Sequence, residues 1–329
     1  MLKTMHADLS HALMITCVMI IPAVSACGEP QKVILGGAPP GSPEITAAQA
    51  LEKLHDIEIK LGLPKTEEPV HFIRTFEPER GNPFVREVLE FDGRDVLLSV
   101  DIYRGKIESL VLHEVSSRYY KNAERKREAG LALSPCKSQE EIITLVKDYM
   151  KKLDVTVPAD YKLGHATYDD GEWDVEFNRE VPGYLVKNDG YSFLVVDETG
   201  ELRLYVNHAF PPVYKTSVKV RPEDAFVTAE KHMKKIMASP PLSEVPFEIV
   251  EHGEPVLMLE YPRSVSFPPS ELSKSNEPKP GLVLTEKSLC LAFAIRFGIN
   301  EWKGAKPHYT NYFEVLVDAE TGEVMGLTR

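Results

Sequence analysis

Segments with the helical spacing of apolar residues alternate along the chain with segments that have the spacing of β-strands. In three segments apolar residues recur at intervals of three and four, which is typical of amphipathic helices packed on a core. The three segments begin at Thr46, at the capping box Ser138–Glu141 and at Pro222, and they are closed by Gly62, Pro158 and Pro240. We therefore expect three helices, each with a core-facing stripe and not a cofactor groove.

Each predicted helix is followed by segments in which apolar and polar residues alternate. These segments are Phe91–Tyr103, Trp173–Phe177, Tyr191–Val195, Leu289–Phe297 and Tyr312–Val317. Because successive side chains of a strand point to opposite faces, this period of two predicts antiparallel sheets with one buried and one solvated face.

A short hairpin motif closes each of these regions. In Val317–Val324 the motif consists of valine, aspartate, a few polar residues, glycine and an apolar residue. It recurs in Val196–Leu202 and, in a degraded form, in Val100–Ile107. An aspartate at this place caps the turn, and the glycine takes a positive φ. The predicted turn residues are Asp101, Gly105, Asp197, Gly200, Asp318 and Gly322. Turn capping is favoured over metal binding, since no second cluster of carboxylates accompanies the aspartates.

The recurrence predicts an α+β protein of three consecutive units, each a helix packed on an antiparallel sheet. The units cover residues 45–133, 134–218 and 219–329. The third unit is longer because it contains a proline- and serine-rich insertion near residues 254–287. Insertions of this size are often functional, so this one is the preferred place for a partner contact.

The pattern resembles the PepSY domain and its YcdB/YcdC-type relatives. The residues that carry the resemblance are Arg221–Ala225 at a helix start, Val317–Val324, and Trp173–Arg179 with Tyr191–Tyr205. The first unit departs from it, because Arg104 replaces the threonine before the glycine. The resemblance implies three PepSY-like units in a secreted or envelope-bound, non-catalytic module, associated in some members with restraint of peptidases. No inhibitory residue can be carried over to this chain.

The N-terminus predicts export. Ala12–Ala26 is an apolar run of 15 residues, shorter than the roughly 20 that a membrane-spanning helix needs. Val24–Cys27 resembles a bacterial lipobox, which predicts a signal peptide over residues 1–26 and a lipid on Cys27. Cleavage by an ordinary signal peptidase is the alternative, and it would leave three cysteines, an awkward number in an oxidising compartment.

The residues that follow predict a tether. Residues 27–44 are rich in glycine and proline and show no apolar period. A lipid on Cys27 would then be the anchor of an extracytoplasmic protein. It would leave Cys136 and Cys290, which can form a disulfide or stay as two buried thiols.

Charge and motifs exclude several classes of function. The formal net charge of −12 over 329 residues disfavours a nucleic-acid partner. The densest basic stretch, Lys121–Arg127, is interpreted as a solvated helix or loop face. No metalloprotease, nucleophile-elbow, phosphate-loop or dinucleotide motif is present, and the histidines show no ligand spacing. Asp169–Glu172 fits a hairpin turn better than a calcium loop. We therefore predict no catalytic, cofactor or metal site.

The resulting functional hypothesis is a membrane-anchored binding module that engages an envelope protein or peptide, with restraint of a peptidase as one form. An exposed strand edge would accept an extended segment of the partner. One alternative is a structural scaffold without a dedicated ligand. The other is a hydrolase that uses carboxylates such as Asp174 and Glu176, which alternate along one strand.

Overall fold

The computed structural model describes residues 33–34, 43–67, 69–78, 84–130, 134–209, 216–238, 248–262, 289–300 and 311–328, all within one unit, Lys32–Arg329. The predicted signal peptide, Cys27, most of the tether and most of the insertion near 254–287 lie outside these ranges and stay predictions. None of the described helices combines the length and the apolar character needed to cross a membrane.

The three predicted helices are confirmed. Helix α1 is Ala47–Leu61, α3 is Gln139–Lys152 and α4 is Pro222–Met237. Thr46 caps α1 and Ser138 caps α3, each through a reciprocal capping box with the residue three positions later. Gly62 ends α1 with a φ of 69°, a conformation that glycine adopts without strain.

A fourth helix, α2, covers His113–Glu128 and was not predicted. Only Val115 and Ala123 of this helix are buried. Its few apolar residues stand among charged ones, so its sequence does not show the clear apolar stripe of the other three helices.

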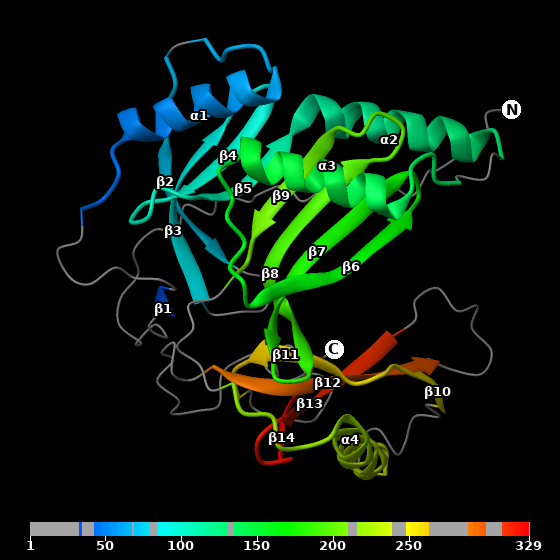
Figure 1. The fold of residues 1–329 in the computed structure, drawn as a ribbon. Helices are drawn as coiled ribbons and strands as arrows, with labels where there is room; N and C mark the ends of the chain where they lie inside the picture. The colour runs from blue at the N-terminus through cyan, green and yellow to red at the C-terminus, as the bar shows by residue number, and fades with distance from the viewer. Residues whose placement is uncertain are drawn as a thin grey trace, which may run out of the picture. The chain divides into compact units, whose positions relative to one another are not determined.

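Nine strands form one sheet (Figure 1). They are β1 (Val33–Ile34), β2 (Ile73–Pro78), β3 (Phe84–Asp92), β4 (Val96–Asp101), β5 (Ile107–Leu112), β6 (Tyr161–Asp169), β7 (Glu172–Val181), β8 (Tyr184–Val196) and β9 (Leu202–Asn207). Their order is β1-β3-β4-β5-β9-β8-β7-β6, with β2 beside β3. All pairs are antiparallel except β1 with β3.

The prediction of three consecutive helix-on-sheet units is therefore wrong. Strand β5 pairs with β9 in the register Ser109↔Val206, Leu110↔Tyr205 and Val111↔Leu204. This pairing fuses strands predicted for two units into one continuous sheet. Periodicity shows which segments form strands, but it does not show which strands become neighbours, and a turn motif can recur within one sheet.

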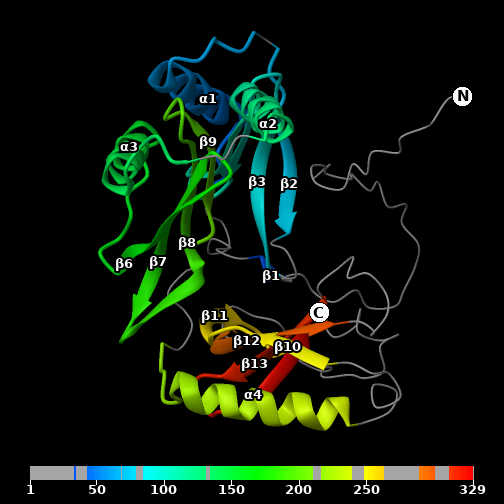
Figure 2. The same ribbon diagram turned by 90° about the vertical axis from the view of Figure 1, so that its right-hand side faces the viewer.

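Helices α1, α2 and α3 cover one face of the nine-stranded sheet (Figures 1 and 2). A single apolar core lies beneath them. It includes Leu54, Val115, Ile142 and Val146 from the helices and Leu98, Leu110, Phe193 and Tyr205 from the strands. Burying each large apolar side chain contributes about 1.5–3 kcal/mol to stability, which holds the helices on the sheet.

The remaining strands form a second sheet of five. They are β10 (Glu248–His252), β11 (Val256–Glu260), β12 (Cys290–Asn300), β13 (Asn311–Asp318) and β14 (Val324–Thr328). The order is β10-β12-β13-β14, with β11 also paired to β12. Helix α4 buries one stripe, Ala225, Ala229, Met233 and Ile236, in the core of this sheet.

The hairpin of β7 and β8 contributes to this second core as well. Its residues Val181 and Val186 are buried there. The Asn188 side chain donates a hydrogen bond of 2.8 Å to the Leu259 carbonyl and accepts one of 2.7 Å from the Leu259 amide. One hairpin thus belongs to the first sheet by pairing and to the second core by packing.

A buried ion pair fixes the base of that hairpin. The carboxylate of Asp189, which is fully buried, accepts hydrogen bonds from Arg179 Nε at 2.7 Å and from the Tyr161 hydroxyl at 2.9 Å. The Arg179 guanidinium lies over the Tyr161 ring and also pairs with Asp160 at 2.5 Å. Burial raises the pKa of Tyr161 well above its ordinary value, so its hydroxyl stays a donor.

Replacing Asp189 with asparagine tests this network. The change leaves the buried Arg179 guanidinium without its main counter-ion, so we expect the free energy of unfolding to fall by about 3 kcal/mol in urea titrations at neutral pH. The matched control is Asp160→Asn, which removes the half-exposed partner of the same arginine and should cost less than about 1 kcal/mol. Equal losses in both variants would contradict the account.

Candidate functional site

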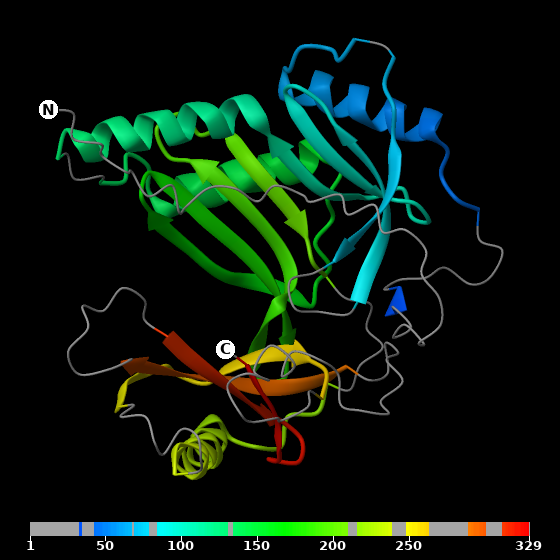
Figure 3. The ribbon, with the colours of Figure 1, turned by 180° about the vertical axis from the view of Figure 1, so that it is seen from behind.

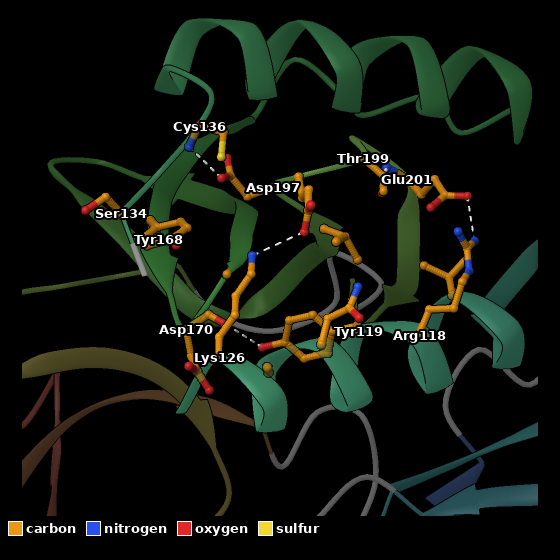
Figure 4. A pocket seen from close by; sticks show the side chains of 16 residues that line it. Arg118, Tyr119, Lys126, Ser134, Cys136, Tyr168, Asp170, Asp197, Thr199 and Glu201 are labelled. Atoms are coloured by element: carbon orange, nitrogen blue, oxygen red, sulfur yellow. Dashed lines mark hydrogen bonds and ion pairs between the residues drawn. The ribbon is translucent and has the colours of Figure 1, made fainter. Parts of the chain in front are cut away.

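A pocket of about 260 Å³ lies between α2 and two hairpin turns of the nine-stranded sheet (Figure 4). We call it the α2 pocket. The helix contributes Val115, Arg118, Tyr119, Asn122, Ala123 and Lys126. Their spacing of three and four residues places them on one face of the helix. That face carries three apolar or aromatic side chains, Val115, Tyr119 and Ala123, together with polar and charged ones.

The opposite wall comes from two turns. The β6–β7 turn contributes Tyr168, Asp170 and Gly171, and the β8–β9 hairpin contributes Val196–Glu201 except Gly200. Asp170 and Gly171 have φ angles of 50° and 91°, as in the tight two-residue turns that suit hairpins. The Tyr119 hydroxyl donates a 3.1 Å hydrogen bond to the Asp170 carbonyl, which ties the helix to this turn.

Asp197 anchors the wall. It is only 2% exposed, and its carboxylate accepts hydrogen bonds from the Cys136 amide at 2.6 Å, the Lys137 amide at 3.1 Å and Trp173 Nε1 at 2.8 Å. Burial alone would raise the pKa of this carboxyl, but the three N–H donors outweigh burial and lower the pKa below its ordinary value. Asp197 is therefore an ionised structural anchor and not a proton acceptor.

Gly200 shares the hairpin of Asp197, whereas Asp101 with Gly105 and Asp318 with Gly322 lie in two other hairpins. The Asp101 carboxylate accepts hydrogen bonds from the amides two and three positions later, at 2.8 and 2.6 Å, and Asp318 does the same at 2.8 and 2.7 Å. Gly105, Gly200 and Gly322 have φ angles of 60°, 72° and 77°. Asp197 differs, because its carboxylate bonds to residues outside its own turn. Of the six, only Asp197 lines the α2 pocket.

Ion pairs form the rim of the pocket. Arg118 donates to Glu201 at 2.7 Å, Lys126 donates to Glu198 at 3.2 Å, and Arg127 pairs with Asp170. Burial would raise the pKa of Glu201, but the bond from Arg118 keeps it lowered. The cations are partly exposed and exposed pairs are weak, so these side chains can exchange partners.

The two cysteines of the described body are free thiols, so the alternative of a disulfide does not hold. Cys136 is exposed at the pocket, and its hydrogen bond to Asp197 raises its pKa. Burial raises the pKa of Cys290 to about 12, and its thiol donates to the Glu260 carbonyl at 3.4 Å. Because the thiolate is the nucleophile, neither thiol is activated.

This arrangement suits binding. Val115, Tyr119, Ala123, Tyr168 and Val196 give the pocket an apolar lining inside a charged rim. Sites for whole small molecules have volumes of about 300–1,000 Å³. A volume of about 260 Å³ fits a side chain of a partner better than a cofactor.

This site was not predicted from the sequence, because α2 was not predicted. Lys121–Arg127 was interpreted as a solvated face, whereas Ala123 is buried and Lys126 lies at the pocket. The signal that could have found it is the spacing of Val115, Tyr119 and Ala123 by four residues each, which is helical but embedded in charged residues.

Comparisons with known proteins do not assign a family. No protein-family model matches the chain, and the curated proteins yield no relative. The Bacillus megaterium YpeB C-terminal domain is similar in structure, with 10% identity, a TM-score of 0.39 and coverage of 87% of this chain and 97% of that one. An uncharacterised protein from Eubacterium rectale has 13% identity, a TM-score of 0.43 and coverage of 85% and 82%. Both scores are below 0.5, so neither likeness carries an argument.

Asp197→Asn tests the role of the anchor. An amide cannot accept all three N–H bonds, so the free energy of unfolding at pH 7 should fall by about 2 kcal/mol. A lowered pKa in the folded state stabilises the protein above the unfolded pKa near 3.9, and this contribution is lost as the pH falls through the folded pKa. The difference between wild type and variant in urea titrations should therefore shrink below pH 4.

The matched control is Asp318→Asn, at the same place in another hairpin. Asp318 accepts two bonds from its own turn, so its loss should cost about 1 kcal/mol. An Asp197→Asn penalty that is no larger than the Asp318→Asn penalty would show that Asp197 is an ordinary turn residue.

Proposed function

We propose that this protein is a binding module whose α2 pocket accepts an apolar side chain from a protein or peptide partner. The observation that carries the proposal is the apolar lining enclosed by weak, exchangeable ion pairs. Such a site gains affinity by burying an apolar anchor and gains orientation from the polar rim.

The charge of α2 favours an acidic partner segment. The helix carries five cations, Arg118, Lys121, Arg125, Lys126 and Arg127, against three carboxylates, Glu114, Glu124 and Glu128. The helix therefore has a positive net charge, in a chain whose net charge is −12. Acidic residues beside the apolar anchor could pair with Arg118 and Lys126 as the partner docks.

The edge strand β6 is a less suitable docking place than the α2 pocket. Among the described strands β6 pairs only with β7, which leaves it at the end of the sheet. The Ala166 carbonyl on β6 is already occupied, since Gln139 Nε2 donates to it at 3.2 Å. Lys162 is exposed on the same strand, and edge lysines oppose the addition of another strand.

We further propose that the module works outside the cytoplasm, held by a lipid on Cys27. The support is the apolar run before Cys27 and its resemblance to a lipobox. In that compartment the partner of the module would be an envelope protein or peptide, for example a peptidase that the module restrains.

A displayed library of random peptides tests the pocket. Peptides selected on the wild-type chain should share an apolar residue flanked by aspartate or glutamate. Asn122→Trp fills the mouth of the pocket from an exposed position and should weaken these peptides at least about tenfold in direct binding measurements.

Lys121→Trp is the matched control, because this exposed neighbour does not line the pocket. It should leave the affinity of the selected peptides within about twofold of wild type. Peptides that bind both tryptophan variants equally well, or a selection without enrichment, would refute the assignment of the α2 pocket.

Cys27→Ser tests the anchor in a bacterium that expresses the full chain with its leader. The wild type should be recovered with membranes and released by detergent, because acyl chains give stable membrane attachment. The variant should lose this attachment. A wild-type chain recovered free of membranes would contradict lipid anchoring while leaving the pocket proposal intact.

A further inference from the structure

Three potential metal ligands meet on β6 and β7 of the nine-stranded sheet, which Figure 3 shows from behind. They are His165 on β6 and Asp174 and Glu176 on β7. Asp174 and Glu176 alternate with Trp173 and Val175 of the core beneath the helices, so the group lies on the opposite face of the sheet. One ligand atom from each lies within 4.8 Å of the others. His165 Nε2 is 3.3 Å from Asp174 Oδ2, and His165 Nδ1 is 3.5 Å from Glu176 Oε2. Among the described residues this is the one such group of three.

A β-bulge places the histidine there. The register of β6 and β7 runs Leu163↔Phe177 and then His165↔Glu176, so Gly164 is an extra residue. Without it, His165 would face Val175 and the apolar core. The bulge therefore moves the imidazole to the side of the carboxylates, a known use of bulges at functional sites.

Gly164 leaves room for the Asn178 side chain at this bulge. A Cβ atom at this position would lie 1.9 Å from Asn178 Oδ1, so the Asn178 side chain would have to move. A glycine at a strand interior otherwise weakens the strand. Its presence here is explained by the close approach that the bulge needs.

The carboxylate of Glu176 has unmet bonding capacity. Its Oε2 is buried and has no hydrogen-bond partner among the described residues, although the side chain is 16% exposed. A cation between the three side chains would satisfy the free oxygen and remove the repulsion between the carboxylates.

We propose that His165, Asp174 and Glu176 bind a divalent transition-metal ion, with Zn²⁺ the best match. One imidazole nitrogen and two carboxylate oxygens suit Zn²⁺, whereas Ca²⁺ and Mg²⁺ prefer oxygen ligands alone. Bonds of about 2.1 Å require ligand atoms roughly 3.4 Å apart in a tetrahedral site. The ligand atoms lie within 4.8 Å of one another, and rotation of the half-exposed Asp174 side chain would bring its carboxylate to the shorter spacing. The ion would fasten the edge strand β6 to β7, and water would complete its coordination.

Isothermal titration of the untagged full chain with ZnCl₂ tests the site. We expect one equivalent to bind at pH 7, with weaker binding below pH 6 because protons compete for the imidazole and the carboxylates. His165→Gln and Glu176→Gln should each weaken this binding at least about tenfold. The glutamine at position 176 has the same shape as the glutamate, so this variant tests the charge without a change in packing.

His113→Gln is the matched control. His113 Nε2 lies 3.2 Å from Asp92 Oδ1, and no third ligand joins this pair in the part of the chain that the structure describes. Its loss should leave the affinity for Zn²⁺ unchanged. A wild-type chain that binds no Zn²⁺ at millimolar concentration, or Zn²⁺ affinities that are equal in wild type, His165→Gln and Glu176→Gln, would overturn the proposal. In either case the contacts of His165 with the two carboxylates would be structural only.

Discussion

The pairing of β5 with β9 determines the architecture. These strands are far apart in sequence, and their three residue pairs join two groups of strands into one sheet. Helix α2 follows β5 directly, so the pairing also sets α2 beside the β8–β9 hairpin, where Arg118 meets Glu201. The single core beneath α1, α2 and α3 and the α2 pocket both depend on this contact.

The local elements could be predicted from the sequence, and the sheet could not. Capping boxes at Thr46 and Ser138, and glycines with positive φ at Gly105 and Gly322, are encoded within a few residues. Strand pairing depends on which apolar faces are buried together, and that information is spread along the chain. The hairpin motif suggested three separate units because turn chemistry repeats wherever strands turn. Helix α2 escaped notice because so little of it is buried.

The candidate sites show the same division. Asp197 was identified as a turn residue, but its carboxylate bonds to the start of α3 and to Trp173, which only the folded sheet brings near. His165 was set aside because no ligand spacing surrounds it. It reaches Glu176 only through the bulge at Gly164, and a shift of one residue in register is invisible to periodicity. The contacts of both candidate sites thus depend on strand register and tertiary packing, which local sequence patterns do not encode.

Native-state hydrogen exchange of the backbone amides in β5 and β9 tests the central claim most directly. If one sheet joins these strands, the amides of Ser109–Val111 and Leu204–Val206 should be protected to a similar degree and should exchange together in the same opening event. Two groups of amides that open independently, with clearly different free energies, would show that the chain is divided between β5 and β9 and would contradict this account.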